Sequence, residues 1–250
     1  MHSQSVEMQF EHSEAVVQDV EAVSQESSGS DANKLIMVEA GALDALTKYL
    51  SLSPQDSFEA TVSELLRILF SNPDVLCYKA LISYLNQLIA VLRLESRNAR
   101  FSAARASHEL FDAKNIRDSE LARQAVQPLV DVLNAASESE QQVTLVALIK
   151  LTMGNSSKAS LMTDVQGNPL ESLYKILSSS TSSLELKGNT AQLIFILFNI
   201  PKIQALLMAS ECIEPLILLM QSDSSIAVES GVCAFERLLD DEQLVELAAA

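Results

Sequence analysis

The chain has 250 residues, a formal net charge of −16 and 48% apolar residues, but only 5% aromatic residues, 6 Gly, 6 Pro and no Trp. Scarce turn-forming and aromatic residues argue against a β-sandwich or barrel, whereas frequent Leu, Ala, Ser, Glu and Gln favour an all-α protein. The negative charge excludes a nucleic-acid-binding protein, whose affinity depends on Lys and Arg contacts to phosphate, and it disfavours adsorption to anionic membranes.

Residues 1–31 differ in character from the rest of the chain. They contain seven acidic residues, no Lys or Arg, and many Ser and Gln. Four valines between 16 and 23 follow helical spacing, which suits a helix over about 13–24 that caps the following array. The Ser-rich stretch at 27–30 and the low hydrophobicity favour a disordered acidic leader instead.

From residue 32 onward, a short apolar helix recurs with large residues at i, i+3 and i+7. Its middle members follow one another at steps of 42, 41, 44 and 43 residues, and they are Leu46, Leu88, Leu129, Leu173 and Leu216. This period is typical of the armadillo and HEAT repeat families.

Each apolar helix has the same neighbours. A short helix precedes it, most clearly at 33–40 and 202–210, and a polar hinge follows it, for example at 137–139. A longer amphipathic helix completes the repeat, and these longer helices are predicted at 58–70, 98–111, 141–152, 184–198 and 226–239. Gly41 can end the first short helix in the left-handed conformation.

Three helices per repeat favour armadillo over the two-helix HEAT repeat. The predicted fold is therefore an all-α, armadillo-type right-handed α-solenoid that occupies residues 32–250. Its five repeats are predicted at about 32–71, 72–112, 113–153, 154–198 and 199–240, followed by a partial repeat at 241–250.

Several segments carry a more specific resemblance. The stretch from Asn33 to Leu46, with its Ala-Gly-Ala sequence at 40–42, looks like the opening of an armadillo repeat. Segments 97–105, 191–198 and 234–239 resemble the plant cellulose synthase-interactive proteins. This resemblance implies a scaffold that links cellulose synthase complexes to cortical microtubules, in the cytoplasm at the cell cortex.

The chain departs from that family in two ways. The family's proteins are several times longer and end in a C2 domain, and nothing in this sequence resembles such a domain. The chain also stops at Ala250, soon after 244–247 begins another first helix. We therefore expect a fragment of a longer protein or a truncated gene product.

Signals of catalysis, cofactors and metals are missing from the sequence. The segment from Met153 to Lys158 lacks the spacing of a phosphate-binding loop, and His108 is interpreted as a partly buried helix residue without an oriented partner. Cys77, Cys212 and Cys233 are widely spaced, which indicates buried reduced thiols in an intracellular protein. No signal peptide is apparent, and the most apolar stretch, 193–198, is too short to span a bilayer.

Basic residues gather in one part of this acidic chain. Between residues 93 and 123 the net charge is +2, against −18 elsewhere, and the basic residues there are Arg93, Arg97, Arg100, Arg105, Lys114, Arg117 and Arg123. We call the first four the basic cluster. It could receive an acidic partner such as a tubulin tail or an acidic cytosolic loop. A solvated face with local pairs, such as Arg105 with Glu109, is the favoured alternative.

A second charge pattern follows the repeat. The position 21 residues after each middle leucine is occupied in turn by Arg67, Glu109, Lys150, Ile194 and Arg237. We call Arg67, Lys150 and Arg237 the cationic ladder. Resemblance to armadillo proteins implies that it lines a peptide-binding groove, whereas a cation in a last helical turn would also simply stabilise the helix, by about 0.3–1 kcal/mol.

The sequence thus predicts a non-catalytic protein-binding scaffold. By resemblance its partners are cytosolic regions of cellulose synthase and tubulin, and the apolar face of the helix at 226–239 predicts self-association as well. The alternative is the substrate-binding array of a U-box ubiquitin ligase, although no U-box-like segment precedes the repeats. A nuclear import adaptor is disfavoured, because such arrays use repeated Trp residues and this chain has none.

Overall fold

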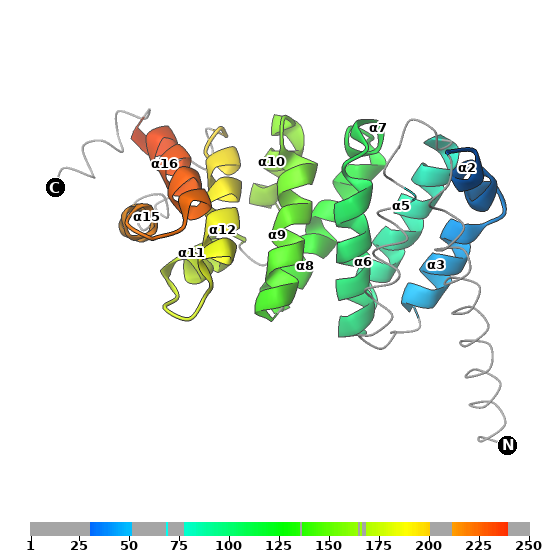
Figure 1. Ribbon diagram of the computed structural model, residues 1–250, viewed down its shortest axis with the longest axis horizontal. Coiled ribbons are helices and arrows are strands. Elements are labelled where there is room, and N and C mark those ends of the chain that lie inside the picture. The colour runs from blue at the N-terminus through cyan, green and yellow to red at the C-terminus, as the bar shows by residue number, and fades with distance from the viewer. Residues whose placement is uncertain are drawn as a thin grey trace, which may run out of the picture. The chain divides into compact units, whose positions relative to one another are not determined.

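The computed structural model describes residues 31–51, 69, 78–135, 137–164, 166, 169–200 and 212–239, and all regular secondary structure in these ranges is helical (Figure 1). In chain order the helices are α2 (Asp31–Glu39), α3 (Ala42–Ser51), α5 (Tyr78–Leu92), α6 (Arg97–Leu110), α7 (Lys114–Arg117), the 3-10 helix η1 (Leu121–Ala125), α8 (Val126–Ala135), α9 (Glu138–Thr152), α10 (Ser156–Asp164), α11 (Pro169–Ser178), α12 (Leu184–Leu197), α15 (Ile213–Met220) and α16 (Ser225–Leu239). The chain forms two compact units, residues 1–121 and 122–250, which are described separately below.

In the first compact unit, Gly41 separates α2 from α3. Its φ of 91° lies in the left-handed region, as the sequence predicted, and its N–H donates to the carbonyl of Val38 at 3.1 Å. A side chain would strain this conformation, so glycine allows the second helix to begin with only two residues between it and the end of the first.

The rest of the first compact unit is a layer of packed helices. α5 contacts both α3 and α6, and Gln87 Nε2 of α5 donates to Asp44 Oδ1 of α3 at 2.6 Å. Tyr84 of α5 is buried, and burial raises the pKa of its phenol far above the ordinary value.

The second compact unit repeats this arrangement. α9 and α16 both pack against α12, while α8 packs on α9, α11 on α12, and α15 on α16. Ser172 Oγ of α11 donates to Asn134 Oδ1 of α8 at 2.6 Å, so apolar helices of successive repeats are again joined by a side-chain hydrogen bond at their edges.

The five middle leucines form the core that the 42-residue period predicted. Each is almost completely buried, in α3, α5, α8, α11 or α15. The long helices of the second to fifth repeats also form close to their predicted ranges, whereas the predicted helix at 58–70 lies outside the described residues except for Leu69. Since each apolar face is covered only by neighbouring helices, the burial pattern is that of a stacked repeat.

The short first helices vary more than the sequence suggested. α2 matches the prediction at 33–40, and α10 forms at the corresponding place in the fourth repeat. In the third repeat the corresponding segment contains only the four-residue α7 and then the 3-10 helix η1. The predicted helix at 202–210 and the leader at 1–30 lie outside the described residues, so the predicted domain boundary at residue 31 stays a prediction.

The turn between α9 and α10 has no phosphate-loop geometry. Gly154 adopts a φ of 69°, and Asn155 Oδ1 accepts the backbone N–H of Lys158 at 3.1 Å, which caps α10. The Lys158 side chain is buried. A helix cap therefore accounts for the small and polar residues of this segment.

Candidate functional site

A serine precedes each described long helix. The hydroxyls of Ser96, Ser183 and Ser224 each accept a hydrogen bond, at 3.3 Å, from the backbone N–H of the residue three positions later. Such N-caps satisfy helix-terminal donors that otherwise lack a partner. The sequence analysis did not use this signal, although a serine in front of each amphipathic stretch is visible in the sequence.

The fourth serine, Ser137, caps α9 in a different way. Its backbone N–H and its hydroxyl both donate to Oε2 of Glu140, at 2.5 and 2.6 Å, and the Glu140 carboxylate is largely buried. The predicted polar hinge at 137–139 is therefore wrong in its extent, since α9 already begins at Glu138.

The capping serines define a register for the long helices. Thirteen residues after each serine lie Glu109, Lys150, Ile196 and Arg237, all of them half-buried. The spacing from the middle leucines had placed Ile194 in this row, but Ile194 is buried in the core and Ile196 takes the equivalent position.

The structure places two of the three cationic-ladder residues, both in the second compact unit. Lys150 lies in the last turn of α9 and Arg237 in the last turn of α16. Arg237 Nη2 donates to Oδ1 of Asn199 at 2.5 Å, and Asn199 Nδ2 donates to the carbonyl of Phe195 at 3.0 Å. Arg237 is thus tied to the end of α12, and Arg67 lies outside the described residues.

Side chains on α9, α12 and α16 form further rows in the same register. Nine residues after the capping serines, Val146, Gln192 and Cys233 are all half-buried. Because α12 packs against both α9 and α16, these residues and the ladder cations belong to one surface of the second compact unit. We call it the long-helix surface. One of its rows contains Val146, Gln192 and Cys233, and the row beside it contains the cations Lys150 and Arg237.

The opposite end of the long-helix surface is acidic. Oε1 of Glu138 accepts the backbone N–H of Ser183 at 2.8 Å, and hydrogen bonds from Ser183 hold the pKa of the Glu138 carboxyl below its ordinary value. Glu185 in the first turn of α12 is exposed as well. Carboxylates near helix N-termini and cations near C-termini both complement the helix dipoles.

The basic cluster lies in the first compact unit, at the turn between α5 and α6 and along α6. Arg93 and Arg97 are exposed, whereas Arg100 and Arg105 are half-buried. Arg97 and Arg100 lie three residues apart on α6, so both can face the same ligand. Arg123 belongs to the second compact unit, and therefore it is not placed relative to this cluster.

The predicted partial burial of His108 in a helix is confirmed, but the side chain has a partner that the sequence analysis did not expect. It is a half-buried residue of α6, and its Nδ1 lies 3.3 Å from Oε1 of Glu109. Within the described ranges, no three His, Cys, Asp or Glu side chains lie close enough together to hold a metal ion. No helix of these ranges is long and apolar enough to cross a membrane.

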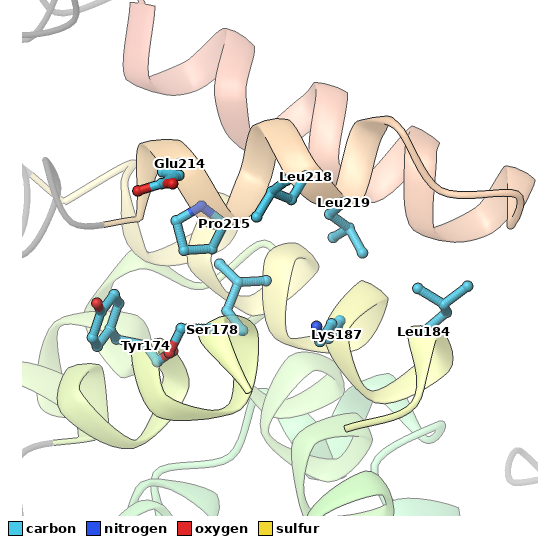
Figure 2. Close-up of a pocket in the computed structure, with 9 residues that line it drawn as sticks. Tyr174, Ser178, Leu184, Lys187, Glu214, Pro215, Leu218 and Leu219 are labelled. Carbon is cyan, nitrogen blue, oxygen red and sulfur yellow. The ribbon is translucent and has the colours of Figure 1, made fainter. Parts of the chain in front are cut away.

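The second compact unit also contains a cavity that the sequence did not indicate. It has a volume of about 300 Å³ and lies between α11, the first turns of α12, and α15 (Figure 2). The lining residues are Tyr174, Leu177, Ser178, Leu184, Lys187, Glu214, Pro215, Leu218 and Leu219. We call it the α15 cavity.

Comparison with solved structures supports the armadillo fold. No family model matches the chain. An engineered protein has a TM-score of 0.69 at 20% identity, with 90% of this chain and 92% of that chain covered. A designed armadillo repeat protein in complex with the peptide (KR)4 has a TM-score of 0.63 at 20% identity, with 88% and 91% covered. The chain therefore has an all-α, armadillo-type solenoid fold.

Two curated proteins share sequence with most of this chain. Protein CELLULOSE SYNTHASE INTERACTIVE 2 of Arabidopsis thaliana is 48% identical over 222 residues, and protein CELLULOSE SYNTHASE INTERACTIVE 3 is 59% identical over 224 residues. These alignments cover 89% and 90% of this chain but only 10% of each relative, so the chain spans about a tenth of their length. The chain is thus homologous to a segment of the cellulose synthase interactive proteins, the family that its sequence motifs resemble.

Proposed function

We propose that the chain is a non-catalytic protein-binding scaffold that helps to link cellulose synthase complexes to cortical microtubules in cellulose biosynthesis. The observation that carries this proposal is the homology to relatives named for their interaction with cellulose synthase. It favours this function over the substrate-binding array of a U-box ubiquitin ligase. The chain would act in the cytoplasm at the cell cortex.

The long-helix surface is the proposed contact for a cytosolic segment of cellulose synthase. An extended peptide across α9, α12 and α16 would meet the row of Val146, Gln192 and Cys233, and beside it the cations of Lys150 and Arg237. Asn199 adds an exposed amide at the end of α12. Cations suit carboxylates or backbone carbonyls, and amides suit peptide backbone groups.

The basic cluster is the proposed contact for tubulin. A chain of net charge −16 repels an acidic partner in general, so any tubulin contact has to be local. Arg93 and Arg97 are exposed and can approach an acidic tail directly. Contacts of this kind mainly accelerate association and weaken as salt is added.

Two binding assays run in parallel test this division. Purified chain is incubated with cytosolic regions of cellulose synthase in a pull-down, and with microtubules in a co-sedimentation assay. Changing the four arginines of the basic cluster to Gln should reduce only the microtubule signal. Reversing Lys150 and Arg237 to Glu should reduce only the synthase signal.

Lys175→Gln is a matched control for these variants, because Lys175 is an exposed cation of α11 that pairs with Glu171 at 2.6 Å. It should change neither signal. If the wild-type chain binds neither cellulose synthase nor microtubules, the proposed function is refuted.

We also propose that the chain self-associates through exposed apolar residues of α16. Ile226 and Val232 of α16 are large apolar residues that are 70% and 46% exposed. Exposed apolar surface of this kind favours association as concentration rises. Light scattering over a concentration series tests it, and Ile226→Asp should lower the apparent mass at high concentration.

A further inference from the structure

The α15 cavity is a depression lined by both polar and apolar side chains, and two leucines at its edge are exposed. Leu177, Pro215 and Leu219 contribute buried lining, while Leu218 is 60% and Leu184 40% exposed (Figure 2). Exposing a leucine costs the free energy that burial would gain, about 25 cal/mol per Å² of apolar area. The surface therefore presents a protruding leucine beside a hole of about 300 Å³ that can receive one.

Two opposite charges border the same cavity. Lys187 comes from α12 and Glu214 from the first turn of α15. In the view of Figure 2, Glu214 and Leu218 lie on the α15 side of the cavity and Lys187 lies on the α12 side. Among the described residues, neither the Lys187 ammonium nor the Glu214 carboxylate has a recorded hydrogen bond or ion pair, so both are available to a ligand.

The patch formed by the cavity, Leu218, Lys187 and Glu214 is complementary to an identical patch on a second copy of the chain. A two-fold axis brings the same patch of two copies together, and each contact is then made twice. Leu218 of one copy would fill the cavity of the other, and Lys187 would face Glu214 of the second copy at both ends. A partner of a single charge sign would leave either the cation or the carboxylate facing a like charge.

We propose that the α15 cavity and its rim form a symmetric dimer interface between two copies of this chain. The interface is separate from the exposed end of α16 that carries Ile226, and it does not depend on binding to cellulose synthase. Its combination of leucines with charged and polar side chains matches the mixed composition of protein interfaces. Because each copy carries a net charge of −16, association is best measured near 0.15 M salt, where repulsion beyond about 8 Å is screened.

The charges allow a specific test by sedimentation equilibrium on the full chain. Lys187→Glu creates two contacts between like charges in the dimer, and so does Glu214→Lys. Each single variant should dimerise at least about tenfold more weakly than the wild type, because like charges across an interface are strongly unfavourable. An equimolar mixture of the two variants should dimerise like the wild type, since both contacts in the mixed dimer join opposite charges.

Two further variants separate this interface from the α16 end. In a chain that also carries Ile226→Asp, so that association through α16 is removed, Leu218→Asp should prevent dimerisation while the circular dichroism spectrum stays helical, because the side chain is mostly exposed. Ile226→Asp changes a similarly exposed apolar residue outside the cavity, and it should leave this dimer unchanged.

Three outcomes would overturn the proposal. A wild-type chain that stays monomeric at high concentration shows that the cavity does not bind a second copy, and an apolar segment of another protein would then be its occupant. A mixture of the two charge variants that does not recover dimerisation excludes the two-fold pairing. Dimerisation that is lost in Ile226→Asp but kept in Leu218→Asp assigns self-association to α16 instead.

Discussion

Glu138 and Ser183 lie 45 residues apart and join the N-terminal ends of two successive long helices. Oε1 of Glu138, in the first residue of α9, accepts the backbone N–H of Ser183, the N-cap of α12, at 2.8 Å. A carboxylate at this place satisfies a donor and complements the positive ends of two helix dipoles. One side chain thus links adjacent repeats at their most electropositive points.

This contact predicts a pH dependence of stability. Because the pKa of Glu138 is lower in the folded chain than its ordinary value, the charge stabilises the fold above that ordinary value, near 4.3, and the contribution disappears as pH falls through the folded pKa. Glu138→Gln keeps an acceptor but removes the charge. Its melting temperature should lie below that of the wild type at pH 7, and the two should converge as the pH falls through the lowered pKa of the folded chain.

Glu229→Gln is the matched control for the pH experiment. Glu229 is exposed and lies beyond the first turn of α16. Glu229→Gln therefore removes a charge that does not cap a helix N-terminus. Its melting temperature should follow that of the wild type across the whole pH range. If the difference for Glu138→Gln did not shrink as the pH falls below the ordinary carboxyl pKa, the charge would not be the cause.

α12 and α16 pack closely at Gly188, and this contact predicts the effect of larger side chains there. A Cβ atom at Gly188 would lie 3.4 Å from the Cα of Ala227, an ordinary contact distance with no room beyond it. Gly188→Ala should therefore stabilise the chain by up to about 1 kcal/mol, since alanine favours the helix interior. Gly188→Leu should destabilise it by about 1–3 kcal/mol through overpacking. Urea denaturation of both variants measures this, and equal effects would contradict the close approach.

Substitutions at Ser224 measure how much an N-cap contributes to the free energy of unfolding. Ser224→Ala removes the acceptor of the Ala227 N–H and should cost about 1 kcal/mol. For a chain of this size that lowers the melting temperature by about 2–4 °C. Ser224→Asp should restore most of the loss, because aspartate also caps helices. Ser225→Ala, an exposed neighbour inside the helix, should have little effect. A loss in Ser225→Ala equal to that in Ser224→Ala would contradict the capping role.

The sequence alone was sufficient to locate the core and most of the helices. The middle leucines recur because every repeat buries the same position against its neighbours, and Gly41 is recognisable because only glycine adopts its conformation easily. The register of the long helices was less certain. In three repeats the capping serine lies eight residues after the middle leucine, but Ser183 lies ten residues after Leu173, so spacing from the leucines selected Ile194 in place of Ile196.

The candidate sites could not be predicted to the same degree. The hydrogen bond between Arg237 and Asn199 joins residues 38 positions apart, and the α15 cavity depends on how three helices pack. Neither leaves a periodic signal, because both arise from tertiary contacts of single side chains. The sequence placed Lys150 and Arg237 at equivalent positions of their helices, but it did not indicate the partner that holds Arg237.

The cationic ladder gives the last prediction. Reversing Arg67, Lys150 and Arg237 to Glu should weaken binding of an acidic peptide far more than any single change, for which partly exposed contacts predict about 0.2–1 kcal/mol. The loss should appear mainly as slower association, and binding should become less sensitive to salt. Because Arg237 also bonds to Asn199, the triple variant should lose some thermal stability too.

Asn199→Ala separates these two effects, since it removes the acceptor of Arg237 but keeps all three cations. If the ladder binds the peptide, Asn199→Ala should lower the melting temperature like the triple variant and leave the salt dependence of association unchanged. Lys150→Glu alone should do the reverse: slower association with a nearly unchanged melting temperature. Unaltered binding by the triple variant, with a lower melting temperature, would show that the ladder only stabilises helix ends and that the long-helix surface binds its partner by other residues.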